Sequence, residues 1–329
     1  MTGLTTDGAT VELALESHRV ELTGYCYRML GSAFEAEDAV QDTLVRAWKA
    51  AEKFEGRSSL RSWLYKIATN VCFDMLDGRQ RRALPMDMGP AQPAEVGLSA
   101  PLPEVAWLQP VPDARVVPTG GDPAEIAELR DTIRLAFVTT LQLLPPNQRA
   151  VLILREVLRW PATEVAELLG TSVPSVNSAL QRARATLAES GASTDAPAPK
   201  PLDSAQRDLL DRYVAAFESY DMERLTALLA EDASWSMPPY DLWLQTHPDI
   251  RAWCLGPGIG CEGSRLVPIS ANGSPGFAQY KPDPAGGFGA WSLQVLDVDP
   301  GGQHLNGIIF FLDVESIYPM FGLPLHLDP

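Results

Sequence analysis

The stretch FEGRSSLRSWLYKIATNVCFDMLDGRQRR, residues 54–82, decides the fold at the front of this 329-residue chain. Its apolar residues recur at steps of four and three, the spacing of one buried helix face. They are Leu60, Leu64, Ile67, Val71 and Met75. The residues left available on another face are Arg61, Tyr65, Lys66 and Asn70. Such an aromatic and basic face beside a polar loop suits gripping unpaired bases, and an ordinary solvated helix face fits the pattern equally well.

The preceding segment EAEDAVQDTLVRAW, residues 35–48, has the same helical period. Its inward residues are Ala36, Val40, Leu44 and Ala47, and a second face carries Asp38, Gln41, Asp42 and Val45. Residues 12–82 contain no proline, and their four glycines, at positions 24, 31, 56 and 78, are expected at or near helix ends. An all-helical domain is therefore predicted over residues 10–85.

Nine prolines between Ala83 and Pro123 interrupt the helical pattern. This segment is too rich in proline for a helix and too poor in ordered apolar residues for strands, which predicts a linker over residues 86–123. Helical periodicity returns over residues 124–190, and GASTDAPAPKP begins a second linker, residues 191–203. The third domain, residues 204–329, is expected to open with helices at 205–219, 222–230 and 247–254 and to continue as strands within SRLVPISAN, GFAQYKP, GAWSLQVLDVD and HLNGIIFFLDVES.

The middle domain contains a helix-turn-helix pattern in PATEVAELLGTSVPSVNSALQRARATL, residues 161–187. Gly170 supplies the turn and Ser172 is placed to cap the second helix. The first helix is expected to bury Val165, Ala166 and Leu169, and the second Val173, Val176, Leu180, Ala183 and Leu187. The outward residues of the second helix are Ser175, Asn177, Ser178, Gln181, Arg182, Arg184 and Ala185. They favour DNA binding over a plain helical hairpin with a polar face.

The formal net charge of −16 argues at first against nucleic acid, because binding depends on neutralising phosphates with Lys and Arg. The charge is unevenly spread, however. Residues 46–82 hold nine basic and four acidic groups, whereas residues 191–329 hold seven basic and 18 acidic groups. This asymmetry indicates that the two ends have different roles. It also predicts an intramolecular contact in which the acidic C-terminal domain docks on the basic faces of the front half.

Together the front segments resemble the extracytoplasmic-function, or group IV, sigma factors of the sigma-70 family. EDAVQDTLVRAW is similar to sigma region 2.2, and residues 54–82 resemble regions 2.3 and 2.4, with the F-x-G-x-S-x-L-x-x-W-L-x-x-I-A-x-N-x-x-x-D pattern intact. Residues 144–187, from LPPNQRAVL to QRARATL, are similar to region 4. The resemblance implies two all-α domains that bind core RNA polymerase and direct promoter-specific transcription initiation.

The same resemblance implies roles for individual residues. Contact with the beta and beta-prime subunits of core polymerase would involve Asp38, Gln41, Asp42 and Val45. The non-template strand of the minus-ten element would be melted and held by Ser58, Arg61, Trp63, Lys66 and Asn70, with the loop Phe54 to Ser59. Trp63 fits a core anchor equally well. The minus-thirty-five element would be bound in the major groove by Ser175, Asn177, Ser178, Gln181, Arg182 and Arg184. The proline-rich linker would thread through the polymerase toward the RNA exit path.

The C-terminal segment resembles a second family, the SnoaL-like polyketide cyclases, in LLDRYVAAFESYDMERLTALLAEDASWSMPP and NGIIFFLDVESIYPMFGLP. This implies an α+β cone, a curved sheet wrapped by helices, which we expect to modulate the sigma factor. Ionisable residues that would line the cone are Asp241, His247, Glu262, His304 and Asp313. Aromatic candidates are Trp235, Trp243, Trp253, Phe277, Trp291 and Phe310. Proton abstraction by a carboxylate, sensing of a small apolar molecule and plain core packing are all open.

Two functions of other classes compete with the sigma factor: a cyclase or isomerase whose front end only tethers it to DNA, and a helix-turn-helix regulator that acts without polymerase. The region 2 pattern discriminates against both, because neither needs a clamp-binding helix together with a strand-melting loop. We predict no catalytic residue and no cofactor. No metal site is predicted either, because four dispersed histidines and the spacing of Cys254 from Cys261 match no common arrangement.

The sequence carries no apolar run long enough to cross a membrane and no basic, apolar start typical of a secretory signal. We therefore expect a cytoplasmic protein without membrane contact. In that compartment thiols stay reduced, so the four cysteines are expected to be free core residues. They are Cys26, Cys72, Cys254 and Cys261.

Overall fold

The computed structural model of the protein describes residues 8–54, 56, 58–189 and 202–329. The chain divides into two compact units, and one of them is interrupted in sequence. Unit 1 comprises Met1–Arg82 and Asp113–Pro199, and unit 2 comprises Ala83–Pro112 and Lys200–Pro329. The segment 83–112, which we call the strap, therefore joins the two parts of unit 1 while it belongs to unit 2. Of the second predicted linker, residues 191–201 lie outside the described residues.

The front part of unit 1 consists of helices, as its apolar spacing predicts. These are α1 (Gly8–Glu16), α2 (Arg19–Leu30), α3 (Ala33–Ala50), the short turn η1 (Ala51–Lys53) and α4 (Leu60–Leu76). Serine caps begin the two longest helices. Ser32 accepts a hydrogen bond from the Glu35 backbone at 3.2 Å, and Ser59 accepts one from the Ser62 backbone at 3.0 Å.

Gly24 does not lie near a helix end, contrary to the prediction, but inside α2. A Cβ atom at this position would lie 2.6 Å from the carbonyl oxygen of Val116, which belongs to the short helix α5 (Asp113–Val116). Glycine is therefore required because another backbone approaches the helix closely, and not because the helix stops there.

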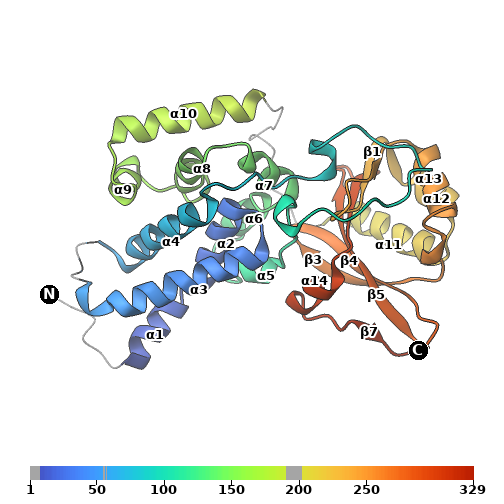
Figure 1. Ribbon diagram of the computed structural model, residues 1–329, viewed down its shortest axis with the longest axis horizontal. Coiled ribbons are helices and arrows are strands. Elements are labelled where there is room, and N and C mark those ends of the chain that lie inside the picture. The colour runs from blue at the N-terminus through green and yellow to red at the C-terminus, as the bar shows by residue number, and fades with distance from the viewer. Residues whose placement is uncertain (1–7, 55, 57, 190–201) are drawn as a thin grey trace. The chain divides into compact units, whose positions relative to one another are not determined.

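In its described residues, the second part of unit 1 contains α5 and five further helices (Figure 1). They are α6 (Pro123–Asp131), α7 (Leu135–Gln142), α8 (Pro146–Leu152), α9 (Ala162–Leu168) and α10 (Val173–Glu189), with a π-helical turn η4 (Ile153–Val157) after α8. The predicted helix-turn-helix is formed by α9 and α10. Gly170 adopts a φ of +63°, and the Ser172 hydroxyl accepts a hydrogen bond from the Ser175 backbone at 3.3 Å.

The buried stripe of α10 contains Val176, Leu180, Ala183 and Leu187 as predicted, whereas Val173 is only half-buried. On α9, Leu168 is buried in place of the predicted Leu169. The inward face is thus confirmed with a shift of one residue on the shorter helix.

Two buried arginines connect the two parts of unit 1. Arg28 of α2 donates hydrogen bonds to Thr132 Oγ1 at 2.7 Å and to the Leu129 carbonyl at 3.1 Å. Arg149 of α8 donates to the Met29 carbonyl and, at 2.7 Å, to Gln142 Oε1. Burial lowers the pKa of both guanidinium groups to about 10, so both stay charged at neutral pH. Their charges are satisfied by carbonyl, amide and hydroxyl oxygens.

Unit 2 is built around one sheet with the strand order β2-β1-β6-β5-β4-β3. The strands are β1 (Leu229–Ser236), β2 (Trp243–Leu244), β3 (Arg265–Ala271), β4 (Ser274–Pro282), β5 (Phe288–Val298) and β6 (Leu305–Phe311), and β7 (His326–Leu327) pairs with β5. β1 and β6 run parallel, and the other pairs run antiparallel. Register shifts after Gln279 and Asp297 bend the sheet.

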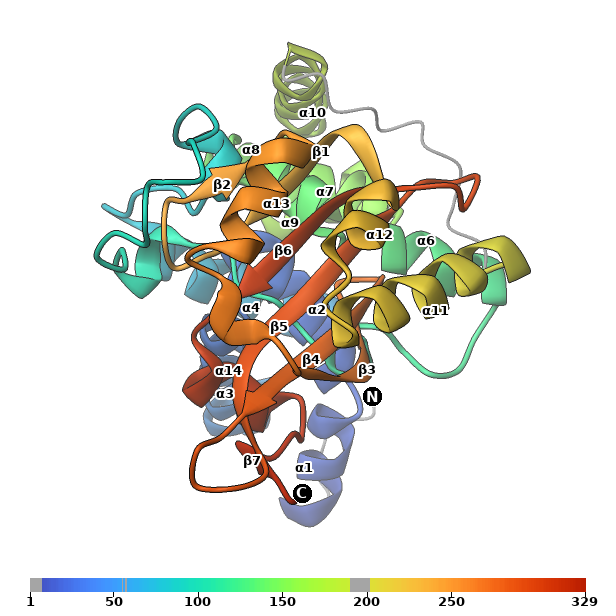
Figure 2. The ribbon, with the colours of Figure 1, turned by 90° about the vertical axis from the view of Figure 1, so that its right-hand side faces the viewer.

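One face of this sheet is covered by α11 (Ser204–Glu218), α12 (Met222–Ala227) and α13 (His247–Leu255) (Figure 2). A last helix, α14 (Val314–Met320), follows β6. The predicted α+β fold, a curved sheet covered by helices, is confirmed. The helix expected over 222–230 ends at Ala227, however, because residues 229–236 form β1, whose pairing with β6 outweighs the helical pattern of LTALLAED.

The strap is held on unit 2 by hydrogen bonds along its length. The Gln92 backbone donates to the Trp243 carbonyl at 2.9 Å, and the Leu102 backbone donates to the Pro239 carbonyl at 2.8 Å. At its end, Val111 and Asn272 exchange two hydrogen bonds of 3.0 Å. The buried side chain of Ala94 joins the hydrophobic core of unit 2. The front of the predicted linker over 86–123 is therefore a docked segment and not a free connection.

None of the described helices combines the length and apolar character needed to cross a membrane.

Candidate functional site

The helix α3 carries the four residues predicted to contact polymerase. Asp38, Gln41 and Val45 are exposed, and half-buried Asp42 forms a 2.7 Å ion pair with Arg46. All four share one face, because they are spaced three or four residues apart. Trp48, which the sequence reasoning missed, continues this face with 59% of its surface exposed. The sequence could have indicated this, because Trp48 follows Val45 by three residues and therefore lies on the same helix face.

The residues predicted to bind the minus-ten element lie along α4 and the loop before it. Lys66 and Asn70 are exposed, whereas Ser58, Arg61 and Trp63 are half-buried. The Trp63 ring packs against Phe54, with 4.8 Å between ring centroids. Within the predicted loop Phe54 to Ser59, Glu55 and Arg57 lie outside the described residues.

Tyr65 was expected to be available to bases and is instead fully buried. Its ring lies 5.2 Å from that of Tyr25 and 4.9 Å from that of Trp160. Tyr65 follows Leu64 on α4 and packs between the two parts of unit 1. Helical periodicity alone does not predict this contact, because its partner Trp160 lies far away in the sequence. Burial and the neighbouring Glu21 raise the pKa of its phenol, so it stays neutral.

Arg61 is the most engaged of the predicted minus-ten residues. Its Nε donates to Glu21 Oε2 at 2.7 Å. Its guanidinium lies 5.3 Å from the Tyr65 ring centroid and 5.2 Å from that of Trp160. The carboxylate of Glu21 and the two aromatic rings hold this cation within unit 1, so binding of a phosphate competes with these contacts.

The recognition helix α10 exposes every residue predicted to bind the minus-thirty-five element: Ser175, Asn177, Ser178, Gln181, Arg182 and Arg184. Arg182 donates to Ser178 Oγ at 2.7 Å within the helix. Arg184 reaches back to Glu156, with Nε 2.5 Å from Oε1. The helix therefore presents a polar face with two arginines, the groups that contact base edges and phosphates in a major groove.

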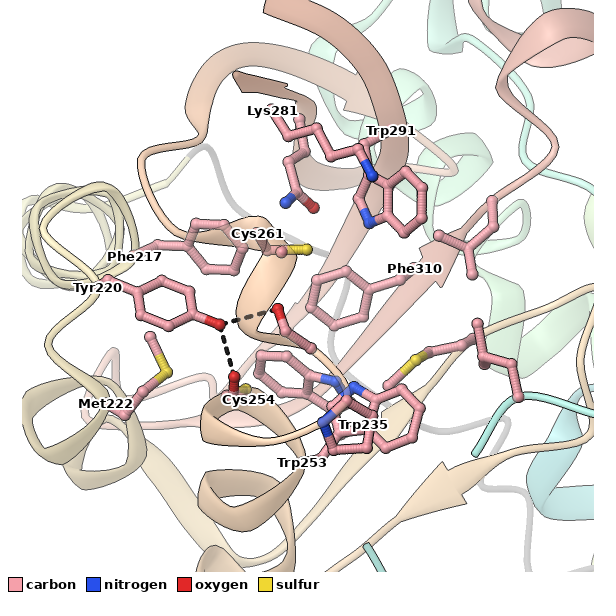
Figure 3. Close-up of a pocket in the computed structure, with 17 residues that line it drawn as sticks. Phe217, Tyr220, Met222, Trp235, Trp253, Cys254, Cys261, Lys281, Trp291 and Phe310 are labelled. Atoms are coloured by element: carbon pink, nitrogen blue, oxygen red, sulfur yellow. Dashed lines mark hydrogen bonds between the residues drawn. The ribbon is translucent and has the colours of Figure 1, made fainter. Parts of the chain in front are cut away.

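Unit 2 contains a cavity of about 310 Å³ between the sheet and its covering helices (Figure 3). Of the predicted aromatic residues, Trp235, Trp253, Trp291 and Phe310 line it. The other two serve packing: the Trp243 indole donates to the Gly89 carbonyl of the strap at 2.9 Å, and Phe277 packs on Tyr213. The cavity is thus aromatic as predicted, with a smaller set of rings.

None of the five ionisable residues expected in the cone lines this cavity. Asp241 accepts a hydrogen bond from Ser99 of the strap, His247 Nε2 contacts the Ala230 carbonyl, and Asp313 precedes α14. Glu262 and His304 are exposed. The ionisable side chains that do line the cavity are Lys281, Tyr220 and the thiols of Cys254 and Cys261. The sequence analysis did not single out Lys281. A carboxylate placed for proton abstraction is absent from the described lining.

Three of the four cysteines are buried as predicted, and Cys261 is the exception. All four cysteines are free; Cys26, Cys72 and Cys254 are buried, while Cys261 is partly exposed and lines the cavity together with Cys254. Burial raises the pKa of the Cys254 thiol to about 12. Among the described residues, no cluster of three or more His, Cys, Asp or Glu is arranged to hold a metal ion.

Comparison with known proteins agrees with this geometry. The family model described as Sigma-70 region 2 matches residues 14–82, and Sigma-70, region 4 matches residues 134–187. The chain is 45% identical over 313 residues to the ECF RNA polymerase sigma factor SigG of Mycobacterium tuberculosis H37Rv, covering 94% of this chain and 82% of the relative. It is 32% identical over 163 residues to SigW of Bacillus subtilis, covering 49% of this chain and 78% of the relative.

The fold is also similar to the crystal structure of the Mycobacterium tuberculosis extracytoplasmic function sigma factor SigJ, with a TM-score of 0.56, 21% identity and coverage of 97% of this chain and 100% of that one. The likeness includes unit 2. Relatives matched over both sigma regions favour the sigma factor over the two competing functions. The chain belongs to the extracytoplasmic-function sigma factors, which bind core RNA polymerase and promoter DNA and direct transcription initiation.

Proposed function

We propose that unit 2 restrains this sigma factor by holding the strap. The observation that carries the proposal is the docking of residues 83–112 on unit 2, through backbone bonds at Gln92, Leu102 and Val111. The strap connects the two parts of unit 1. The part before it contains the predicted minus-ten residues, and the part after it contains the recognition helix. A connector bound along its length has less freedom to extend than a free chain of the same length.

The resemblance to sigma factors implies that this connector threads through polymerase toward the RNA exit path. A strap docked along unit 2 cannot at the same time extend through polymerase, so docking and threading exclude each other. Binding of polymerase must therefore supply the free energy that releases the strap. In this proposal unit 2 acts on the chain's own connector and requires no separate inhibitor.

The polymerase-binding face is assigned to Asp38, Gln41, Asp42 and Val45, extended by Trp48, with the beta and beta-prime subunits as its partners. Lys66 and Asn70 are free to contact the non-template strand at once, and Arg61 joins them after it leaves Glu21. The recognition helix binds the minus-thirty-five element through Gln181, Arg182 and their polar neighbours. The protein then works beside RNA polymerase in the cytoplasm and carries out no reaction of its own.

Run-off transcription with purified core polymerase tests the proposal, on promoters selected from a random library with the full chain. Asn272→Gly removes the side-chain acceptor for the Val111 amide and tolerates the φ of +56° at this position. We expect it to raise the transcript yield about threefold or more at limiting sigma, because an undocked strap no longer costs about 1 kcal/mol to release.

Ser99→Ala is the matched control. It also removes one hydrogen bond between the strap and unit 2, but that bond is exposed to solvent. We expect its yield to equal that of the unchanged protein. Equal yields from Asn272→Gly and the unchanged protein would contradict the restraint by unit 2. Absence of a promoter-directed transcript from every selected sequence would contradict sigma activity itself.

A further inference from the structure

The cavity of unit 2 has flat aromatic walls and one cationic group. Trp235 and Phe310 lie on adjacent strands with 4.4 Å between ring centroids, and Trp253 comes from α13. Figure 3 shows Phe310 in the middle of the cavity, with Trp235 and Trp253 on one side of it and Trp291 and Lys281 on another. Ring faces from both strands and helices favour a flat apolar occupant.

Lys281 is the only lining side chain with a full charge at neutral pH in the described cavity. Its Nζ atom lies 3.3 Å from the centroid of the Trp291 ring, and no ion pair to a described carboxylate includes it. The ring face stabilises the ammonium without neutralising it. A ligand anion at this point meets an unneutralised positive charge and no lining carboxylate that repels it.

Other polar groups at this end are fixed by the protein. Gln279 Oε1 accepts hydrogen bonds from Ser292 Oγ at 2.7 Å and Gln294 Nε2 at 3.1 Å, while its Nε2 donates to Ser264 Oγ. At the opposite wall the Tyr220 hydroxyl is directed at the carbonyls of Cys254 and Gly258, at 2.6 and 2.9 Å. Because these groups already have partners, Lys281 is the group that selects the polar end of a ligand.

The size of the cavity limits the ligand further. An engineered apolar cavity of about 150 Å³ holds one benzene molecule. A cavity of about 310 Å³ therefore has room for about two fused aromatic rings and a small substituent.

We propose that the cavity binds a small aromatic anion of about two fused rings, with its rings against the aromatic wall formed by Trp235, Trp253 and Phe310 and its carboxylate or similar group against Lys281. The ligand class follows from the lining, and no cofactor chemistry is implied. The cavity is a binding site and not a reaction centre, because the described lining supplies no carboxylate base.

The strap contributes one wall of this site, through Leu98. Leu98 keeps 39% of its surface exposed, so a ligand that packs against it buries further apolar area. Bound ligand and docked strap then stabilise each other to the same extent, as linkage requires. This coupling rests on the proposed restraint, in which unit 2 holds the strap. The aromatic anion would then be a ligand that keeps the strap docked.

Calorimetric titration of the full-length protein with 2-naphthoate tests the ligand class, and 2-naphthylmethanol serves as the neutral probe of the same shape. We expect saturable binding of 2-naphthoate with a change in tryptophan fluorescence, and weaker binding of the alcohol. Lys281→Gln is expected to weaken 2-naphthoate binding about tenfold, as the loss of a hydrogen bond to a charged group does. Lys281→Arg keeps the charge and should restore affinity to within about threefold.

Arg251→Gln controls for net charge, because Arg251 is an exposed cation of α13 outside the lining. Equal weakening by Arg251→Gln and Lys281→Gln, tighter binding of the alcohol than of the acid, or no saturable binding of either probe would each overturn the site. Far-ultraviolet circular dichroism of each variant checks that the fold is kept, and the arginine variant preserves the test if the glutamine variant unfolds.

Coupling to the strap is measured separately by amide hydrogen exchange of residues 83–112 with and without 2-naphthoate. We expect slower exchange with the probe, and loss of this protection in Leu98→Ala but not in Val105→Ala, an exposed strap residue outside the lining. Binding without any change in exchange would overturn the coupling while the ligand site stands. None of these measurements uses polymerase, so their failure is distinguishable from failure of the transcription test.

Discussion

The guanidinium of Arg61 lies 5.2 Å from the ring centroid of Trp160, which brings a residue of the predicted minus-ten face against the segment that precedes α9. The same guanidinium is paired with Glu21 at 2.7 Å. Binding of a DNA phosphate by Arg61 therefore competes with the contacts that this residue makes within unit 1. In this state the front and back parts of unit 1 hold each other through a side chain that we assign to DNA.

Removing the charge of Glu21 should release Arg61 for DNA. Glu21→Gln is expected to tighten binding of a single-stranded minus-ten oligonucleotide about threefold, because the loss of an ion pair worth about 0.5–1 kcal/mol leaves the arginine free for a phosphate. Fluorescence anisotropy at constant salt measures the change. Glu16→Gln, which breaks the exposed pair with Arg19, is the control and should leave the affinity unchanged. Equal affinities of Glu21→Gln and the unchanged protein would contradict the assignment of Arg61.

The buried guanidinium of Arg149 should be needed to keep the two parts of unit 1 together. Arg149→Met is expected to lower the free energy of unfolding of unit 1 by about 3 kcal/mol, because the Met29 carbonyl and the Gln142 amide lose a charged partner in a buried place. Hydrogen exchange of the α2 and α8 amides in urea measures it. Arg130→Met, at an exposed position of α6, should change exchange little. Similar exchange in both variants would show that the hydrogen bonds of Arg149 contribute no net stability.

Arg182, one of the two exposed arginines of the recognition helix, should carry much of the minus-thirty-five affinity. Arg182→Ala is expected to weaken binding to a selected minus-thirty-five duplex about tenfold or more, because a bidentate arginine contact is worth about 1–3 kcal/mol. A gel-shift titration with polymerase-bound protein measures the loss. Arg130→Ala again provides the control, since it removes an arginine of unit 1 outside α10. A duplex affinity that survives Arg182→Ala would remove this residue from the interface.

Loss of the bond between Val111 and Asn272 should expose the strap to protease. Asn272→Gly is expected to speed cleavage within residues 83–112 about fivefold, because local opening costs about 1 kcal/mol less. Limited proteolysis followed by mass spectrometry locates the cuts. Ser99→Ala should cleave at the rate of the unchanged protein. If cleavage of Asn272→Gly instead falls in the strands of unit 2, the bond supports the sheet and not the strap.

The reactivity of Cys261 should report on Lys281. Burial raises the pKa of the Cys261 thiol, while Gln279 and the charge of Lys281 oppose this rise. Lys281→Gln removes one opposing charge, so the pKa rises further and less thiolate is present at pH 8.5. We expect iodoacetamide to alkylate Cys261 more slowly in this variant, as followed by peptide mass spectrometry. Cys254, whose pKa burial raises to about 12, is the internal reference. Faster alkylation of Cys261 would show that Lys281 shields the thiol instead.

Local pattern was sufficient for the helices of unit 1 and for the exposed face of α10, because a 3.6-residue period and a serine cap leave few alternatives. Long-range packing decided the rest. Tyr65 sits on the same period as its neighbours, yet Tyr25 and Trp160 bury it. The helix predicted over 222–230 loses its last residues to β1, because β6 offers that segment a partner strand. Proline content correctly excluded regular elements from most of the strap, but it gave no sign that Asn272 and Trp243 would bind the segment.

The order of the strap and its partners along the chain also affects how the protein is made. The strap leaves the ribosome before β1 to β6, and about 90 residues separate Pro112 from Lys200, where the remainder of unit 2 begins. At ordinary translation speeds the first strands that bind the strap follow on the order of ten seconds later. During that interval a newborn chain has both promoter-binding parts and an undocked connector. In the proposed mechanism, restraint is acquired only after the strands of unit 2 have been made, and a chain that still lacks them has not yet gained it.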